Sequence, residues 1–411
     1  MFSTFRSLKH PNFRALWLGL VFSASGSWLQ LVGQGLLVLR LSNGSALALG
    51  SVSLAQGVAF FIFVLAGGVL ADRLEPRRIL FFTQSAALCF ALILSLLTFV
   101  GVVQVWSVVL LAFLSSAASS FDQPARAALL PRLVPAEDLG NAVALQTLAF
   151  NTAATLGPTL AGVAIAGLGF SGTFFLNALS FLGVLAALFY LRVPKRVGEE
   201  TVGRLTPAAF FASSLEGIAA VRGSAMLSFA LSAYGVMLLV GPSTSFLLPL
   251  LATNVLQVGE TQLGLMFSAA GVGAISGAIV TASLNEEANR IRFLLLSLAV
   301  WSMAMVAIGL SGRFWVVLPV LFVWGAARNA VGTTASAILQ LHVADALRAR
   351  VMSLNALIVM GARPLGDFGL ALLVSIFSVT PVILGGAAVV GVQTMWLGWG
   401  QRAAQKAKAA D

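Results

Sequence analysis

Three charged side chains lie inside long apolar runs of this sequence, where a charge needs a partner or a function. Arg363 and Asp367 are four residues apart in the stretch GARPLGD, and Arg328 lies within another apolar run. Residues four apart face each other on a helix, so Arg363 and Asp367 can form an ion pair. The residue types allow three chemistries: an arginine that binds an anionic substrate group, an aspartate that carries a proton, or a structural ion pair between helices.

Uncharged polar side chains also recur at helical spacing inside apolar runs. The two clearest stripes are Ser23, Ser27, Gln30 and Gln34, and Ser115, Ser119 and Asp122. In lipid, such stripes must face protein or water, so they are candidates to line a cavity. The alternative is that the serines allow close packing between helices. The candidate substrate or proton cavity contains Gln30, Gln34, Ser119, Gln146, Arg328, Asn355, Arg363 and Asp367.

Composition defines the class of protein that must position these groups. The 411 residues are 59% hydrophobic and only 9% charged, whereas a soluble domain has roughly 25% charged residues. We therefore expect a polytopic membrane protein. The sequence has no G-x-x-x-x-G-K-[ST] loop for ATP, a single cysteine, and two histidines far apart, so we expect no cofactor and no metal site.

Apolar runs of roughly 20 residues are long enough to cross a bilayer as helices. We predict an all-α fold with twelve transmembrane helices, near 13–40, 46–71, 79–101, 104–123, 141–166, 172–192, 223–250, 261–283, 292–311, 314–339, 351–377 and 380–401. Gly167–Gly172 and Ser378–Pro381 divide the two longest runs. The polar segment Val193–Arg222 predicts a cytoplasmic linker at 193–222, between a bundle at 1–192 and a bundle at 223–411.

The basic residues are distributed unevenly over the predicted loops. Of the 24 Lys and Arg residues, 20 fall in the termini and alternate loops of one side, and only Arg40 and Arg313 fall on the other. This is the positive-inside pattern, which predicts cytoplasmic termini in the cell inner membrane. It also explains the net charge of +10 without a nucleic-acid partner. The N-terminal apolar run is too long for a cleaved signal peptide and predicts an uncleaved first span.

The two halves show weak internal similarity. Residues 141–157 align with 350–366 at an offset of 209, which pairs Gln146 with Asn355 and Gly157 with Gly366. These segments are the fifth and eleventh predicted spans, where a six-span repeat would place them. Two such halves are one arrangement of secondary transporters, whose site lies near the membrane midplane between the halves.

The stretch GGVLADRLEPRR resembles the major facilitator superfamily signature G-x-L-A-D-R-x-G-R-R, although Glu75 and Pro76 depart from it. The series FDQPARAALLPRLVPAEDLGNAVAL, LGPTLAG and FLNALSF is similar to the branch that contains the enterobactin exporter and macrolide efflux proteins, also called transmembrane secretion effectors. The resemblance implies the major facilitator fold: two pseudo-symmetric six-helix bundles around a central cavity, moving by alternating access.

The resemblance also assigns roles to two motifs. The charged loop implies a latch that closes the cytoplasmic side, in which Asp72 faces a helix N-terminus of the other half and Arg73 or Arg77 reaches Asp122. The alternative is a solvated turn. The expected gate residues are Asp72, Arg73, Arg77, Arg78, Asp122 and Arg126. Gly157, Pro158 and Gly162 resemble the antiporter signature G-P-x-x-G-G, although Ala161 departs from it; the alternative is a kinked packing helix.

These features predict a secondary active exporter of small amphipathic molecules, drugs or siderophore-like metabolites. The resemblance implies that the exporter draws on the proton gradient and that it functions as a monomer. Its expected partners are the substrate and the lipid bilayer. A lipid or lysolipid translocator and an importer on the same fold remain open. A membrane-embedded transferase is the third alternative, although it would need a reactive cluster near an interface.

Overall fold

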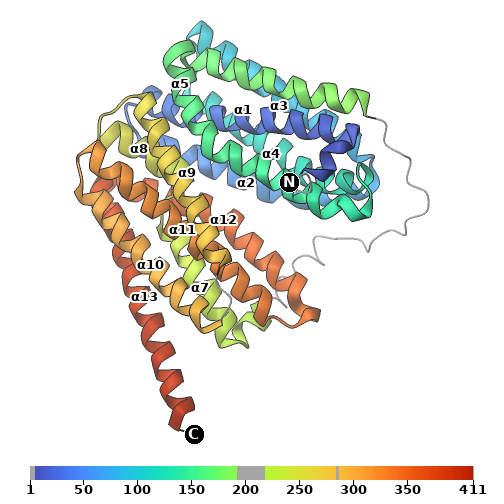
Figure 1. Ribbon diagram of the computed structural model, residues 1–411. Coiled ribbons are helices and arrows are strands. Elements are labelled where there is room, and N and C mark those ends of the chain that lie inside the picture. Colours follow the sequence, from blue (N-terminus) through green and yellow to red (C-terminus); the bar gives the residue numbers. More distant parts are fainter. Residues whose placement is uncertain (1–4, 192–217, 284–286, 411) are drawn as a thin grey trace. The chain divides into compact units, whose positions relative to one another are not determined.

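The computed structural model describes residues 5–191, 218–283 and 287–410. The side chains of 65–73, 287–289, 345–346, 348–349, 353, 356–357, 360 and 401–410 lie outside the description. The described chain is built from helices, and no β-strand occurs among these residues (Figure 1). The elements are η1 (Arg6–Lys9), α1 (Pro11–Leu41), α2 (Ala46–Arg73), α3 (Pro76–Val100), α4 (Val105–Leu129), η2 (Leu130–Arg132), α5 (Ala136–Tyr190), α7 (Ala225–Val240), α8 (Thr244–Leu250), η3 (Leu251–Val255), α9 (Glu260–Ala282), α10 (Glu287–Leu310), α11 (Phe314–His342), α12 (Asp345–Phe377) and α13 (Val379–Ala410).

Ten of the described helical segments are long and apolar enough to cross a membrane. One of them, α5, has 55 residues and contains two spans. The 33-residue helix α12 provides a further span. The described helices thus account for the twelve transmembrane helices that the sequence predicts.

The two spans within α5 are separated at Gly169, in the predicted turn. Gly169 has φ 68° and ψ −178°, a backbone conformation that favours glycine. Contacts with α1 give the direction of each arm. The first arm ascends along α1, since Trp17 contacts Leu145 and Trp28 contacts Gly157.

The second arm descends along the same helix. Gly33 contacts Phe174, Gly26 contacts Asn177 and Ser180, and Gly19 contacts the backbone of Val184. The two arms therefore run antiparallel, and the turn at Gly169 completes a helical hairpin around α1.

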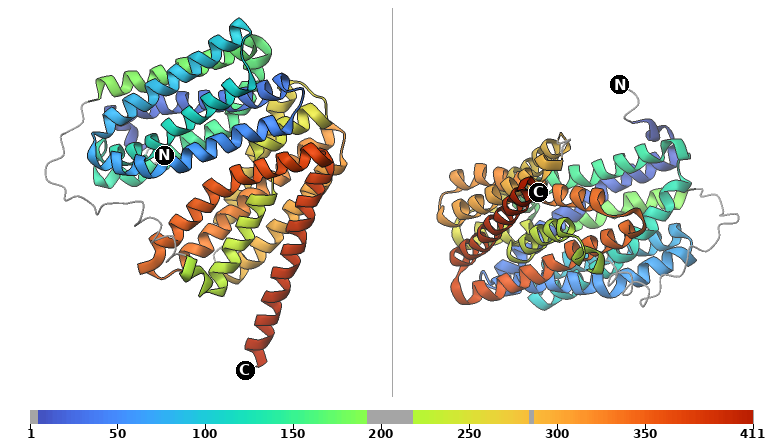
Figure 2. Two further views of the ribbon diagram at one scale, coloured as in Figure 1. Left: turned by 180° about the vertical axis from the view of Figure 1, so that it is seen from behind. Right: turned by 90° about the horizontal axis from the view of Figure 1, so that it is seen from below.

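The chain divides into two compact units, which are described separately. In described residues, unit 1 comprises 5–43, 54–191 and 260–264, and unit 2 comprises 44–53, 218–259, 265–283 and 287–410. Unit 1 has an apolar core where α1, α3, α4 and α5 meet, with Leu80, Leu129 and Leu188 fully buried. In unit 2, Trp301 and Trp324 are the largest fully buried side chains, and the last turns of α13 extend past the neighbouring helices (Figure 2).

The seventh span differs from its prediction as one continuous helix. α7 ends at Val240 and α8 begins at Thr244, so residues 241–243 interrupt the span. Pro242 lacks the N–H that would continue the hydrogen-bond ladder. Gly241 lies so close to the ring of Trp301 that a Cβ would be 2.7 Å from it. The interruption is therefore set by local sequence and by packing.

Two aligned glycines occupy equivalent positions in the two halves. A Cβ on Gly157 would lie 2.5 Å from Trp28 of the first span, and a Cβ on Gly366 would lie 2.5 Å from the Leu239 carbonyl of the seventh span. Each glycine therefore permits a close approach between the fifth and first spans of its own half, as a six-span repeat requires.

Candidate functional site

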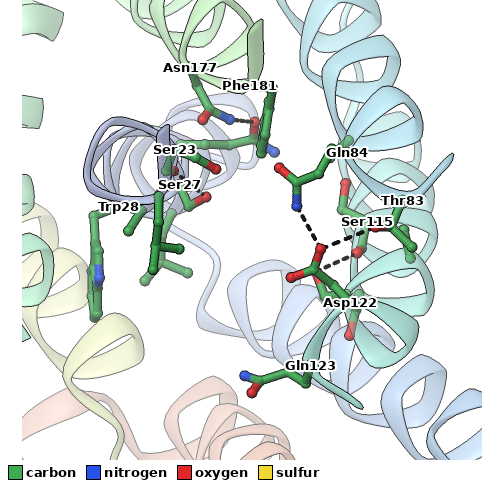
Figure 3. Close-up of a pocket in the computed structure, with 18 of the residues that line it drawn as sticks. Ser23, Ser27, Trp28, Thr83, Gln84, Ser115, Asp122, Gln123, Asn177 and Phe181 are labelled. Carbon is green, nitrogen blue, oxygen red and sulfur yellow. Dashed lines mark hydrogen bonds between the residues drawn. The ribbon is translucent and has the colours of Figure 1, made fainter. Parts of the chain in front are cut away.

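Unit 1 contains a polar pocket of about 400 Å³ among α1, α2, α3, α4 and α5 (Figure 3). Its polar lining residues are Ser23, Ser27, Gln30, Gln34, Gln56, Thr83, Gln84, Ser115, Ser116, Ser119, Asp122, Gln123, Arg126 and Asn177. Trp28, Phe150 and Phe181 add aromatic surface. A volume of this size lies within the usual range for small-molecule pockets.

The stripe predicted on the first span forms one wall of this pocket. Gln34 is buried and its Nε2 donates to the Val108 carbonyl at 3.3 Å, and Gln30 Oε1 accepts from Asn177 Nδ2 at 2.5 Å. Ser27 donates to the Ser23 carbonyl at 2.8 Å. These bonds join α1 to α4 and to the second arm of α5, so the stripe also ties helices together. All four residues of the stripe line this pocket.

Asp122 on α4 is the acidic centre of the pocket. Its carboxylate accepts from Gln84 at 2.7 Å and from Thr83 at 3.1 Å, both on α3. Arg126, one turn further along α4, approaches it to 2.8 Å. Asp122 and Arg126 thus neutralise each other inside the pocket. Gln84 Oε1 and Arg126 Nη1 are buried and have no hydrogen-bond partner among the described groups. The pocket wall therefore offers one hydrogen-bond acceptor and one donor to a ligand.

Of the two arginines predicted to reach Asp122, Arg77 has other partners, and the side chain of Arg73 lies outside the described residues. Arg77 Nε donates to the Leu188 carbonyl at 2.7 Å and Nη2 donates to the Phe189 carbonyl at 2.9 Å. These carbonyls belong to the last turn of α5, where helices leave acceptors unpaired. Arg77 therefore caps α5, while Arg126 takes the place beside Asp122.

The remaining gate residues have separate surroundings. Arg78 forms an exposed ion pair with Glu75 at 3.1 Å. The side chains of Asp72 and Arg73 lie outside the described residues, so their roles in a latch stay predictions.

Unit 2 contains a second polar cavity of about 530 Å³ between α7, α11 and α12. Its lining residues are Tyr234, Met237, Arg328, Asn329, Gly332, Thr333, Ser336, Ala337, Gln340, Val359 and Arg363. Both predicted intramembrane arginines therefore meet here. The Arg328 guanidinium lies 5.6 Å from the centre of the Trp324 ring, a cation–π arrangement.

The predicted ion pair of Arg363 with Asp367 does not form among the described residues. Asp367 is only 2% exposed, and its carboxylate accepts from the Ser243 N–H at 2.8 Å and the Ser243 hydroxyl at 2.6 Å. Arg363 is exposed on the cavity side of α12. Spacing alone allowed the pair, but Asp367 instead holds the interruption between α7 and α8.

The other predicted residues lie outside both cavities. Gln146 is partly buried on α5, and Asn355 is buried on α12 with an Oδ1 that has no partner among the described groups. The antiporter-like residues Gly157, Pro158 and Gly162 lie inside α5, where both glycines make close contacts. Their geometry is that of a packing helix, and it does not test the antiporter role.

Sequence reasoning missed several pocket residues: Gln56, Thr83, Gln84, Gln123 and Asn177. A signal was present, because an amide inside an apolar span is costly unless it faces protein or water. Thr83 and Gln84 interrupt the apolar start of the third span. Only the packing of α3 on α4 shows that they hold Asp122.

A cluster at the N-terminus was also missed. Asp138, at the start of α5 before its apolar segment, is fully buried and lies 3.0 Å from Lys9, 2.8 Å from His10 and against Arg6. Ser7 donates to its carbonyl at 2.9 Å. The hydrogen bond with His10 and the nearby cations hold the pKa of Asp138 below its usual range, against the effect of burial. This network docks η1 on the N-terminus of α5.

Comparisons with known proteins agree with this architecture. The family profile described as transmembrane secretion effector matches residues 2–404. Macrolide efflux protein A of Streptococcus pyogenes is 25% identical, covering 80% of this chain and 81% of that protein. The Staphyloferrin A transporter of Staphylococcus aureus is 23% identical with 90% of both chains covered.

The enterobactin exporter EntS of Escherichia coli O127:H6 is 29% identical, covering 77% of this chain and 74% of that protein. Among solved structures, a bacterial homologue of the iron transporter ferroportin has a TM-score of 0.72 at 17% identity, covering 94% of this chain and 98% of that one. The latter likeness shows the shared fold. The chain therefore belongs to the transmembrane secretion effector family of the major facilitator superfamily, and it is a multi-pass membrane transporter.

Proposed function

We propose that this protein is a secondary active exporter of small amphipathic molecules that works by alternating access and is driven by the proton gradient. The observation that carries the proposal is the unit 1 pocket, where amides, hydroxyls and a neutralised Asp122–Arg126 pair stand beside Trp28, Phe150 and Phe181. Such a lining suits a molecule with both apolar and polar faces. Relatives named for macrolide efflux and enterobactin export support the direction and size class of the substrate.

Asp367 is the proposed proton carrier. Its carboxylate holds the interruption of the seventh span through two hydrogen bonds from Ser243. Protonation would turn one of its acceptor oxygens into a donor, so these bonds would weaken. Proton binding would then loosen the connection between α7 and α8, which is the kind of local change that alternating access requires.

The location and assembly follow the same proposal. The excess of basic residues on one side supports cytoplasmic termini in the cell inner membrane. We propose a monomer that needs no cofactor besides the proton gradient. The latch formed by Asp72 and Arg73 belongs to the proposal as well.

The test is accumulation of a substrate panel in inside-out vesicles, with and without an imposed proton gradient. The panel contains a macrolide, a tetracycline, a cationic dye, a catecholate siderophore and a fluorescent lysolipid. We expect gradient-dependent accumulation of at least one drug or siderophore, and vesicles without the protein are the control. Accumulation that ignores the gradient would contradict proton coupling.

The Asp367→Asn variant tests the carrier. We expect it to keep substrate binding and to lose the dependence of export on the proton gradient. Ser243→Ala is its matched partner, since it removes one of the two hydrogen bonds to Asp367 and leaves the titratable group in place. It also removes the contacts of the Ser243 hydroxyl with the Phe246 N–H and with Ser245. Intact pH-driven export by Asp367→Asn would end the carrier role.

One observation favours a second candidate, a lysolipid translocator. An apolar groove of about 600 Å³ lies between α7, α12 and α13 of unit 2, with Gly366, Gly369, Gly385 and Gly386 in its walls. A groove of this volume and apolar lining fits an acyl chain. Accumulation of the lysolipid alone, among all panel members, would favour this function over drug export.

A further inference from the structure

We propose that the unit 2 cavity binds the carboxylate group of a monoanionic amphipathic ligand between Arg328 and Arg363. The inference rests on the proposed function, because it assigns to unit 2 the recognition of one part of the exported substrate. It goes beyond that function by naming the charged group that the substrate carries.

The first observation is that two guanidinium groups line one cavity. Arg328 on α11 and Arg363 on α12 both face it, and they are close enough for their charges to repel each other. Bringing two cations together inside apolar helices is unfavourable unless an anion joins them. A guanidinium offers a planar fork that matches a carboxylate with two parallel hydrogen bonds.

The second observation is that described protein groups leave this charge incompletely balanced. Neither arginine forms an ion pair with a described carboxylate. Asp367 acts on both cations through space, but its two oxygens accept from Ser243. While Asp367 is ionised, two cations and one such anion leave one positive charge, so a ligand with a single negative charge would neutralise the cavity.

The third observation is that neighbouring aromatic side chains hold the Arg328 guanidinium in position. Arg328 lies over the ring of Trp324, which is fully buried. Tyr234 packs across Gly332, one turn beyond Arg328, where a Cβ would be 2.9 Å from the Tyr234 hydroxyl. That hydroxyl makes no hydrogen bond to another described group, so it is free to donate to a ligand. Met237 and Val359 supply apolar lining for the body of the ligand.

The test measures binding of 4-phenylbutyrate to the purified full chain in phosphatidylcholine nanodiscs by isothermal titration calorimetry. The neutral isostere 4-phenylbutyramide has the same apolar body and no charge. We expect the carboxylate to bind at least ~10-fold more tightly than the amide, because hydrogen bonds to charged groups are the stronger ones. Equal binding of the two compounds would overturn the proposal.

Substitutions locate the site. Arg328→Gln and Arg363→Gln should each weaken phenylbutyrate binding by ~10-fold or more and leave amide binding unchanged. Arg363 is exposed, so its variant should fold even if the Arg328 variant does not. Arg313→Gln, on the exposed N-cap of the same helix α11, is the matched control for loss of one charge. If Arg328→Gln and Arg363→Gln lose no more phenylbutyrate affinity than Arg313→Gln does, the proposed site is contradicted.

Two further arms distinguish the source of the anion. Inorganic phosphate should not displace phenylbutyrate at equal concentration. Adding phosphatidylglycerol to the nanodiscs should leave phenylbutyrate affinity unchanged. If phosphatidylglycerol weakens phenylbutyrate binding to the wild type but not to Arg328→Gln, the cavity binds a lipid headgroup, and the assignment to a substrate is overturned.

The outcomes separate this inference from the proposed function. If export in vesicles depends on the gradient but phenylbutyrate binding does not depend on the arginines, the carboxylate site is wrong and the proposed exporter function stands. If phenylbutyrate binding depends on the arginines but no panel member is exported, the carboxylate site stands and the proposed exporter function is wrong.

Discussion

The polar cavities of the two units differ in whether their charged side chains are paired. In unit 1, Asp122 and Arg126 lie one turn apart on α4 and neutralise each other, with Thr83 and Gln84 completing the shell. In unit 2, Arg328 and Arg363 approach each other from α11 and α12, and Asp367 turns away toward Ser243. A charge paired within one helix is independent of how the helices pack. Arg328 and Arg363 have no counter-charge on their own helices, so both are available to an anionic ligand.

The largest expected effect comes from breaking the balanced pair in unit 1. Asp122→Asn keeps the shape of the side chain but leaves Arg126, whose side chain is 7% exposed, without its counter-charge. Removing one partner of a buried pair costs about 3–5 kcal/mol. Thermal unfolding of the purified protein should show this loss, and the double variant Asp122→Asn/Arg126→Gln should regain part of it. An unchanged unfolding temperature for the single variant would show that the pair is well solvated.

The next effect tests the close contact between α12 and α7 in unit 2. Gly366→Ala places a Cβ 2.5 Å from the Leu239 carbonyl, whereas Gly369→Ala on the same helix meets nothing within 4 Å. Overpacking of this kind costs about 1–3 kcal/mol. Unfolding measurements should show the loss for the first variant alone. Equal results for both variants would mean that α12 can shift away from α7.

A smaller effect on ligand binding should follow from placing a carboxylate side chain in the unit 2 cavity. Gln340 lines the cavity, so Gln340→Glu should compensate the arginines and weaken 4-phenylbutyrate binding by about 10-fold, or 1.4 kcal/mol. Calorimetry with the amide should show no change. Stronger binding of the carboxylate after this substitution would contradict an excess of positive charge in the cavity.

The smallest effect distinguishes the two neighbouring arginines of the charged loop. Arg77→Gln removes two hydrogen bonds to the end of α5 and should cost about 1 kcal/mol. Arg78→Gln removes an exposed ion pair with Glu75 and should cost about 0–1 kcal/mol. Unfolding temperatures measured side by side would decide the order, and a larger loss for Arg78→Gln would argue against the capping role of Arg77.

Much of the architecture was predictable because it depends on local pattern. Apolar runs set the spans, since a bilayer requires about 20 such residues, and the turn at Gly169 falls inside the predicted break. The stripe with Gln30 and Gln34 lies in the unit 1 pocket because helical periodicity places these residues on one face.

The partners of individual charges were less predictable. Spacing allowed Asp122 to pair with Arg126 and Asp367 to pair with Arg363 equally well, yet only the first pair is present among the described residues. The difference arises from the surroundings. Ser243 reaches Asp367 because the seventh span breaks beside it, and no pattern within the eleventh span encodes that break.

The sequence by itself therefore determined the membrane class, the spans and the helix faces that carry polar groups, because each depends on composition or on short-range spacing. Its motifs indicated the family by their resemblance to known sequences. The tertiary structure alone decided that Arg77 caps α5, that Thr83 and Gln84 hold Asp122, and that Arg328 and Arg363 share a cavity. These partners lie on different helices. A hydrogen bond or an ion pair forms only within about 4 Å, and the distance between side chains far apart in the sequence is set by packing of the whole bundle.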